Sequence, residues 1–89
     1  MERSMPFLNR RHCHHWPLSM VSPGDVVQVV TVRGGLGLQR RLTDMGLTPG
    51  AKVRVINNQR PGAVVIYIRG SRLALGHGVA HKIMVASLD

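Results

Sequence analysis

The sequence contains a single cysteine, few aromatic residues and no long hydrophobic run. Cys13 alone cannot form a disulfide within the chain, so nothing in the cysteine content points to an oxidising compartment. One Phe, one Trp and one Tyr leave Val, Ile, Leu and Met to build the core. Apolar runs such as residues 64–68 are far shorter than the roughly 20 residues that span a bilayer. The N-terminus has no apolar core of a secretory signal, so we expect a cytoplasmic protein.

Acidic residues are also scarce. Four Asp and Glu residues stand against 12 Lys and Arg, which gives a formal net charge of +8. Such a surplus favours acidic partners, namely nucleic acid, an anionic membrane face or an acidic protein surface. The basic residues are scattered, and only Arg10–Arg11 and Arg40–Arg41 are adjacent. The surplus is therefore equally consistent with keeping a small domain in solution.

Residues 38–45 have the spacing of a short helix. Leu38, Leu42 and Met45 are separated by four and three residues, which places them on one helical face. Gly46 then stands where a helix ends in a left-handed residue, and Leu47 can fold back onto the helix. The pattern predicts a helix that buries Leu42 and Met45 and ends at Gly46.

Proline and glycine mark the turns between predicted strands. Pro23–Gly24 and Pro49–Gly50 each precede an alternating Val-x-Val segment. Both pairs predict a tight turn, because proline presets φ and glycine accepts a positive φ at the next position. Gly70–Ser71 fits a two-residue hairpin loop. The predicted strands cover residues 26–32, 52–56, 63–69, 72–75 and 83–86, with a short turn or one helical turn at 76–82.

These elements predict a mainly β fold, a small SH3-like barrel of about five strands with one short inserted helix. Residues 1–17 have no sustained hydrophobic period and are expected to form a flexible N-terminal extension. The ordered domain is expected to cover residues 18–89. We find no paired carboxylates, no Ser/His/Asp set and no phosphate-binding loop, so an enzyme is not expected. The segment 35–40 has the first two glycines of a dinucleotide-binding fingerprint, but Arg40 replaces the third. A dinucleotide site is therefore not expected.

Four segments in this order resemble the ferrous iron transport protein A (FeoA) family. They are residues 23–25, 41–50, 69–75 and 80–85, and the resemblance covers about residues 18–88. It implies a cytosolic SH3-like domain that is not an enzyme and requires no cofactor. The resemblance also implies a role beside a ferrous iron permease, with the permease's cytosolic GTPase domain as the contact. The membrane would then be reached only through the permease, and the chain would be a monomer or a weak homo-oligomer.

Histidine and cysteine residues form two candidate metal sites. The metal would be zinc or ferrous iron, bound adventitiously or as a regulator. The first is the run His12, Cys13, His14 and His15, whose alternate members can share one ion. The second is the pair His77 and His81, which are four residues apart and fit one helical face. The alternatives are an incidental tail and two solvated histidines at a barrel corner.

A partner surface is expected on the outer face of the predicted helix and the following turn. Arg40, Arg41, Thr43 and Thr48 are its polar members. Leu47 is either a structural residue packed on the helix end or, if exposed, the apolar anchor of the interface.

The alternative function is a basic, SH3-like or KOW-type barrel that binds nucleic acid. The segment 23–30 followed by two glycines resembles the opening of a KOW segment, and the net charge agrees. However, single-strand binders usually carry several stacking aromatics, and here only Tyr67 and Trp16 qualify. We therefore expect no specific nucleic-acid partner.

Overall fold

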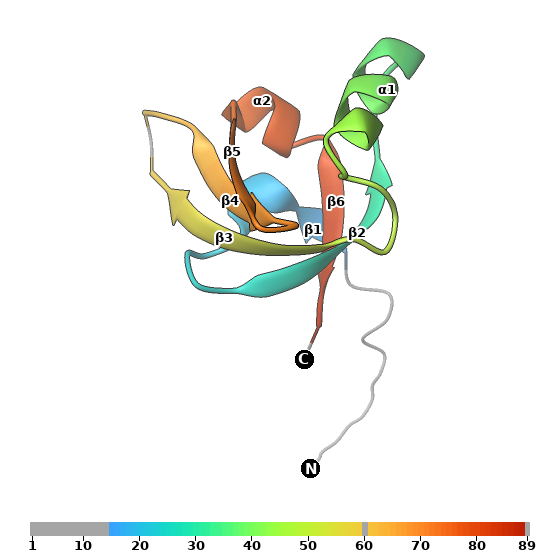
Figure 1. The fold of residues 1–89 in the computed structure, drawn as a ribbon. Helices are drawn as coiled ribbons and strands as arrows, with labels where there is room; N and C mark the ends of the chain where they lie inside the picture. The colour runs from blue at the N-terminus through green and yellow to red at the C-terminus, as the bar shows by residue number, and fades with distance from the viewer. Residues whose placement is uncertain (1–14, 60, 89) are drawn as a thin grey trace.

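The computed structural model describes residues 15–59 and 61–88, which form one curved antiparallel sheet with short helices (Figure 1). The sheet order is β1-β6-β2-β3-β4-β5. The mainly β architecture predicted from the sequence is confirmed. The strands are β1 Trp16–Pro17, β2 Val26–Val32, β3 Lys52–Asn58, β4 Val64–Ile68, β5 Ser71–Leu75 and β6 Ile83–Ser87. The helices are the 3-10 helix η3 Leu18–Met20, α1 Leu36–Asp44 and α2 His77–Ala80.

Alternation along the strands places one set of side chains in a single core. Successive strand residues point to opposite faces, so Val53 and Val55 of β3 and every second residue of β4 are buried, and the residues between them are more exposed. The alternation in β3 ends at the register shift after Val55. Valine, leucine and isoleucine fill the core, as the scarcity of aromatic residues requires. The buried hydrophobic residues are Leu18, Val21, Val27, Val29, Leu42, Leu47, Val53, Val55, Val64, Ile66, Ile68, Leu75, Ala80, Ile83 and Val85.

Two equivalent turns lead into β2 and β3. The turns at residues 22–25 and 48–51 are closed by amide-to-carbonyl hydrogen bonds of 3.2 and 3.0 Å. Gly24 and Gly50 have φ values of 94° and 93°, the conformation that the Pro–Gly pattern predicted. Each of these glycine amides also donates to the neighbouring strand. The repeated Pro–Gly motif therefore places β2 and β3 beside each other.

The C-terminus of α1 explains one wrong expectation. Leu42 is buried, but Met45 is 40% exposed, whereas Leu47 is only 1% exposed. The helix ends at Asp44, and Gly46 reverses the chain with a φ of 93°. The Leu47 amide then donates back to the Leu42 carbonyl over 2.9 Å, as in a Schellman motif. Leu47 thus occupies the core position that the helical spacing assigned to Met45.

The ordered domain begins earlier than expected. Trp16 and Pro17 form β1, which pairs with β6 through Trp16 and Val85. Trp16 also packs against the core, and Leu18 is fully buried. Trp16 and Pro17 therefore belong to the sheet and not to the predicted extension of residues 1–17, whose residues 1–14 lie outside the described part of the chain. A strand of two residues is too short to show a period of alternation, so the sequence pattern did not reveal it.

The β4–β5 hairpin is shifted by one residue from the prediction. Ile68 pairs with Ser71, so the loop residues are Arg69 and Gly70 rather than Gly70 and Ser71. Both have positive φ, 52° for Arg69 and 81° for Gly70, as in a type I′ turn. Arg69 is the single described non-glycine residue with positive φ. Its side chain lies over Gly46, where an added Cβ would be 3.2 Å from Arg69 Cδ.

Candidate functional site

The exposed face of α1 carries most of the predicted partner surface. Arg40, Arg41 and Thr43 are exposed, and Thr48 in the following turn is half-buried. Arg40, Arg41 and Thr43 belong to α1, and Thr48 lies in the turn that follows it. Leu47 does not belong to this surface, because its burial makes it a structural residue. The open alternative for Leu47 is thus decided in favour of the core.

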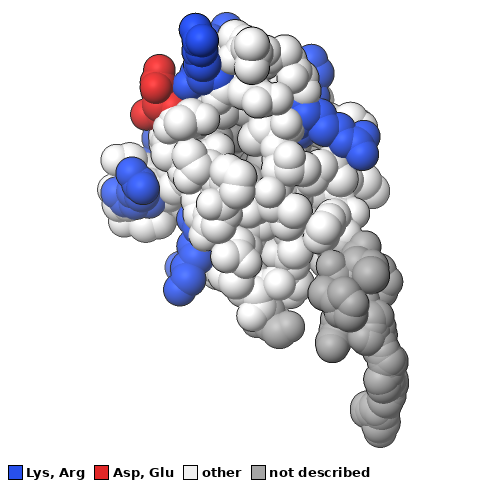
Figure 2. Space-filling view, turned by 90° about the vertical axis from the view of Figure 1, so that its right-hand side faces the viewer, with Lys and Arg blue, Asp and Glu red and all other residues white. Residues whose placement is uncertain are grey.

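Apolar side chains on α1 accompany the arginines. Leu36, in the first turn, is 72% exposed, and Met45, just after the last turn, is 40% exposed. Figure 2 shows the side of the molecule on which α1 and the following loop lie. Lys and Arg side chains stand at the margins of this view, and its centre carries neither basic nor acidic residues. The helix therefore combines apolar and basic groups, the composition typical of a protein contact.

His77, in α2, is held by two oxygens from distant segments. Its Nδ1 lies 2.6 Å from the Gly62 carbonyl oxygen and its Nε2 lies 3.0 Å from Asn58 Oδ1. The Asn58 amide nitrogen donates to the carbonyls of Ser19 and Val21, both over 2.8 Å, which fixes Oδ1 toward the histidine. A neutral imidazole can donate to only one of the two oxygens, and the protonated ring can donate to both. His77 thus ties α2 to the β3–β4 connection.

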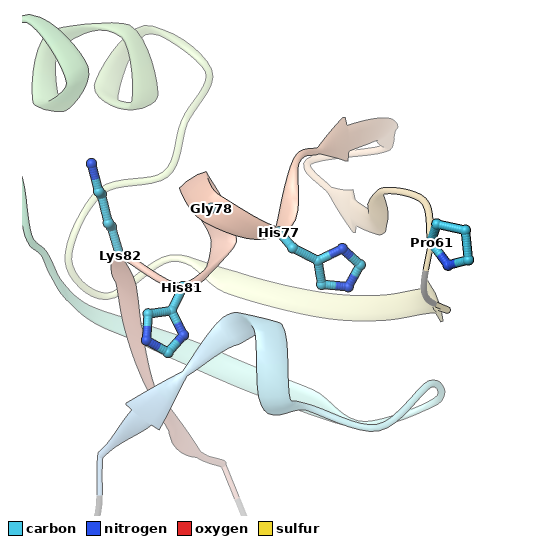
Figure 3. A pocket seen from close by; sticks show the side chains of 5 residues that line it. All are labelled: Pro61, His77, Gly78, His81 and Lys82. Carbon is cyan, nitrogen blue, oxygen red and sulfur yellow. The ribbon is translucent and has the colours of Figure 1, made fainter.

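His81 follows the last residue of α2 and points to a different element. Its Nδ1 lies 3.2 Å from the hydroxyl of Ser19, in η3. Figure 3 shows that the His77 and His81 rings diverge, although both line one open pocket together with Pro61, Gly78 and Lys82. Lys82 also lines the pocket, but its ammonium points away from both rings. The spacing of four residues therefore does not bring the two imidazoles together on one ion.

The predicted metal cluster is not assembled within the described residues. Residues 15–59 and 61–88 contain no group of three or more His, Cys, Asp or Glu side chains placed to hold a metal ion. His15 is exposed at the start of the described chain. His12, Cys13 and His14 lie outside the described residues, so a metal site formed by that run stays a prediction.

Acidic groups are separated in the described chain. Asp25 precedes β2 and Asp44 ends α1, and both are exposed. They are the two acidic residues of the described part, and they do not form a carboxylate pair of the kind used in acid–base catalysis. Within the same residues, no helix has both the length and the apolar character needed to cross a membrane.

A row of polar side chains on the outer sheet face was missed by the sequence reasoning. Arg54 of β3 lies opposite Tyr67 of β4, and Tyr67 lies opposite Arg72 of β5. All three side chains are exposed. The available signal was the alternation of basic and apolar residues at 52–55. Only the strand register shows that the tyrosine stands between the two arginines.

Three comparisons place this fold among known proteins. A protein-family model described as the FeoA domain matches residues 16–87. A protein of Methanocaldococcus jannaschii, provisionally named Fe(2+) transport protein A, is 43% identical over 74 residues, which is 83% of this chain and 89% of the relative.

Two solved structures of similar proteins have the same fold. A crystal structure titled iron uptake regulatory protein (FeoA) has a TM-score of 0.75 and 39% identity, covering 84% of this chain and 99% of that one. A solution structure of the FeoA protein from Chlorobium tepidum has a TM-score of 0.74 and 31% identity, covering 82% and 70%. The SH3-like fold predicted from the sequence is thereby confirmed.

Proposed function

The chain belongs to the FeoA domain family, and from that membership, which brings a role in ferrous iron transport, we propose that it is a non-enzymatic, cytosolic accessory of iron uptake. It docks on the cytosolic domain of a GTPase-type ferrous iron permease and modulates that partner. It reaches the membrane only through the permease and requires no cofactor of its own.

The observation that carries this proposal is the two-sided character of α1. Leu42 is fully buried and Leu38 packs against the core, which fixes the helix on the barrel. The opposite side leaves Arg40 and Arg41 exposed, with Leu36 exposed at the start of the same helix. A rigid helix that presents basic and apolar groups can bind a partner without first becoming ordered, which lowers the entropic cost of association.

Modulation follows from docking if the permease domain has two conformations. A bound protein shifts such an equilibrium only by the difference in its affinity for the two states. A tenfold preference for one state corresponds to about 1.4 kcal/mol of differential contact energy. A few well-placed contacts from α1 are sufficient for an effect of that size, so no catalytic group is needed on this chain.

The test is a titration of the purified cytosolic domain of the permease with this protein. The variant Arg40→Glu/Arg41→Glu reverses the charge of the α1 surface, and Arg54→Glu/Arg72→Glu makes the same change in net charge on the sheet. We expect the α1 variant to weaken binding clearly more than the sheet variant. The loss of affinity should be larger at low salt than at high salt, because high salt screens exposed charges in the wild type as well. Both variants should keep the melting temperature of the wild type. Equal affinity of the wild type and the α1 variant would exclude this surface.

A further inference from the structure

The outer face of the sheet holds a group of basic side chains around one tyrosine. We name it the Tyr67 face, and it consists of Lys52, Arg54, Tyr67, Arg69 and Arg72. All five side chains are exposed, and Tyr67 is 45% exposed. No ion pair joins any of these cations to another residue in the described ranges 15–59 and 61–88. The face therefore presents four positive charges that no described acidic residue neutralises.

Strand register places these groups in a fixed order. Arg54, Tyr67 and Arg72 stand directly opposite one another on three adjacent strands. Neighbouring strands lie about 4.8 Å apart, so the backbones of the two arginines are separated by about 10 Å, with the tyrosine between them. Because the strands belong to one hydrogen-bonded sheet, the spacing is set before any ligand binds. Such preorganisation reduces the entropic cost of binding.

Two hollows adjoin the row and share Lys52 and Arg69. One is lined by Val26, Val53, Arg54 and Tyr67 in addition to the shared pair. The other runs from the shared pair along the turn at residues 48–51. Val26 is half-buried and lies next to the cations in the first hollow, whereas the Val53 side chain belongs to the core. This mixture suits a ligand that carries an apolar side chain beside negative charges.

The backbone of Arg69 supports a use for its side chain. A φ of 52° is unfavourable for a non-glycine residue, and type I′ turns prefer asparagine or glycine there. Arginine is less favourable in this backbone conformation than asparagine or glycine, but it supplies a fourth cation that borders both hollows. Strain retained at an exposed position is a feature of binding sites.

We propose that the Tyr67 face binds an extended, carboxylate-rich peptide segment of another protein. Guanidinium groups pair with carboxylates through two parallel hydrogen bonds, and the tyrosine hydroxyl donates one more. A single-stranded nucleic acid is the alternative anion, but it is usually held by successive stacked aromatics, and this face has one. The aliphatic hollow beside the cations also fits a peptide better. This inference concerns a surface other than α1 and does not depend on the permease.

The probe is a short synthetic peptide rich in glutamate with one leucine, titrated into the isotopically labelled protein and followed by NMR. A single-stranded oligothymidylate of equal length is the second probe. We expect the peptide to shift the backbone amides of residues 52–54 and 67–72, and to bind more tightly than the oligothymidylate. Tighter binding of the oligothymidylate at this face would overturn the choice of a protein partner.

Matched charge variants separate the face from bulk attraction. Arg54→Gln/Arg72→Gln and Arg40→Gln/Arg41→Gln remove the same two charges, and all four residues are exposed. We expect the first variant to weaken peptide binding about five- to tenfold, because it removes two exposed ion pairs with the peptide. The second variant should weaken binding by less than about twofold, because its two arginines lie outside the Tyr67 face. An equal loss in both variants would mean that net charge alone attracts the peptide, and the proposal would be wrong.

Arg69→Asn tests the strained residue independently of the strands. Asparagine accepts positive φ better than arginine, so the melting temperature should rise or stay unchanged. Peptide affinity should fall about two- to threefold, because one exposed cation is lost. A variant that is equally stable or more stable and binds the peptide as tightly as the wild type would remove Arg69 from the face.

Discussion

Replacing Asn58 with alanine should destabilise the domain strongly for a residue that is only half-buried. The Asn58 amide joins three segments that are distant in sequence. Its nitrogen donates to the carbonyls of Ser19 and Val21 over 2.8 Å each, and its oxygen faces His77 Nε2 at 3.0 Å. Ser19 and Val21 are 5% and 3% exposed, so water has little access to their side of the link. Alanine leaves these partners without Asn58.

The size of the effect follows from the three lost contacts. A neutral hydrogen bond contributes about 0.5–1.5 kcal/mol net, and a buried acceptor without a donor costs about 1–3 kcal/mol. We therefore expect Asn58→Ala to lower the free energy of unfolding by about 2–4 kcal/mol. For a domain of this size that corresponds to a fall in melting temperature of about 10–25 °C.

The neighbouring residue provides a matched control. Asn57 is exposed, lies in the same strand and has the same side chain. Both alanine variants should be melted under one set of conditions, with the transition followed by circular dichroism. Asn57→Ala should change the free energy of unfolding by no more than about 0.5 kcal/mol. If the two variants melt within a few degrees of each other, the link through Asn58 does not stabilise the domain as described.

Five further substitutions are best measured by urea unfolding. Gly46→Ala should cost about 1–2 kcal/mol because the position has a φ of 93°, whereas Gly37→Ala, in α1 with nothing near its Cβ, should be neutral or stabilising; the reverse order would refute the proposed helix end. Leu47→Ala should cost about 2–5 kcal/mol and Met45→Ala less than about 1 kcal/mol; similar losses would contradict their difference in burial. Trp16→Ala should cost about 2 kcal/mol, since the side chain is half-buried; an unchanged midpoint would show that β1 adds nothing to stability.

Local patterns predicted the main strands and the turns. Alternation along β3 and β4 and the Pro–Gly pairs before β2 and β3 depend on neighbouring residues, so they can be read from the sequence. β1 depends instead on pairing with β6, at the other end of the chain. The position of Met45 depends on where the helix ends, which Gly46 determines one residue later. Gly46 was correctly predicted to end the helix in a left-handed conformation. Long-range pairing and the exposure of Met45 were therefore the parts that the sequence did not predict.

The candidate site was less predictable than the fold. The exposed arginines of α1 followed from helical spacing, and their exposure is confirmed. His77 and His81 have the spacing of a metal pair, but their ring nitrogens face Gly62, Asn58 and Ser19. The oxygens of these three residues come from segments distant in sequence, whose positions cannot be inferred from the spacing of the two histidines. The Tyr67 face likewise required the register of three strands.

Uptake of radiolabelled ferrous iron by living cells tests the central claim most directly. Cells that lack the gene for this protein should be complemented with the wild type, with Arg40→Glu/Arg41→Glu or with Arg54→Glu/Arg72→Glu, each present at an equal level. We predict that the wild type restores uptake, that the α1 variant restores clearly less, and that the sheet variant restores more than the α1 variant. Full restoration of uptake by the α1 variant would contradict docking through α1, and uptake that is unaffected by loss of the gene would contradict a role as an accessory.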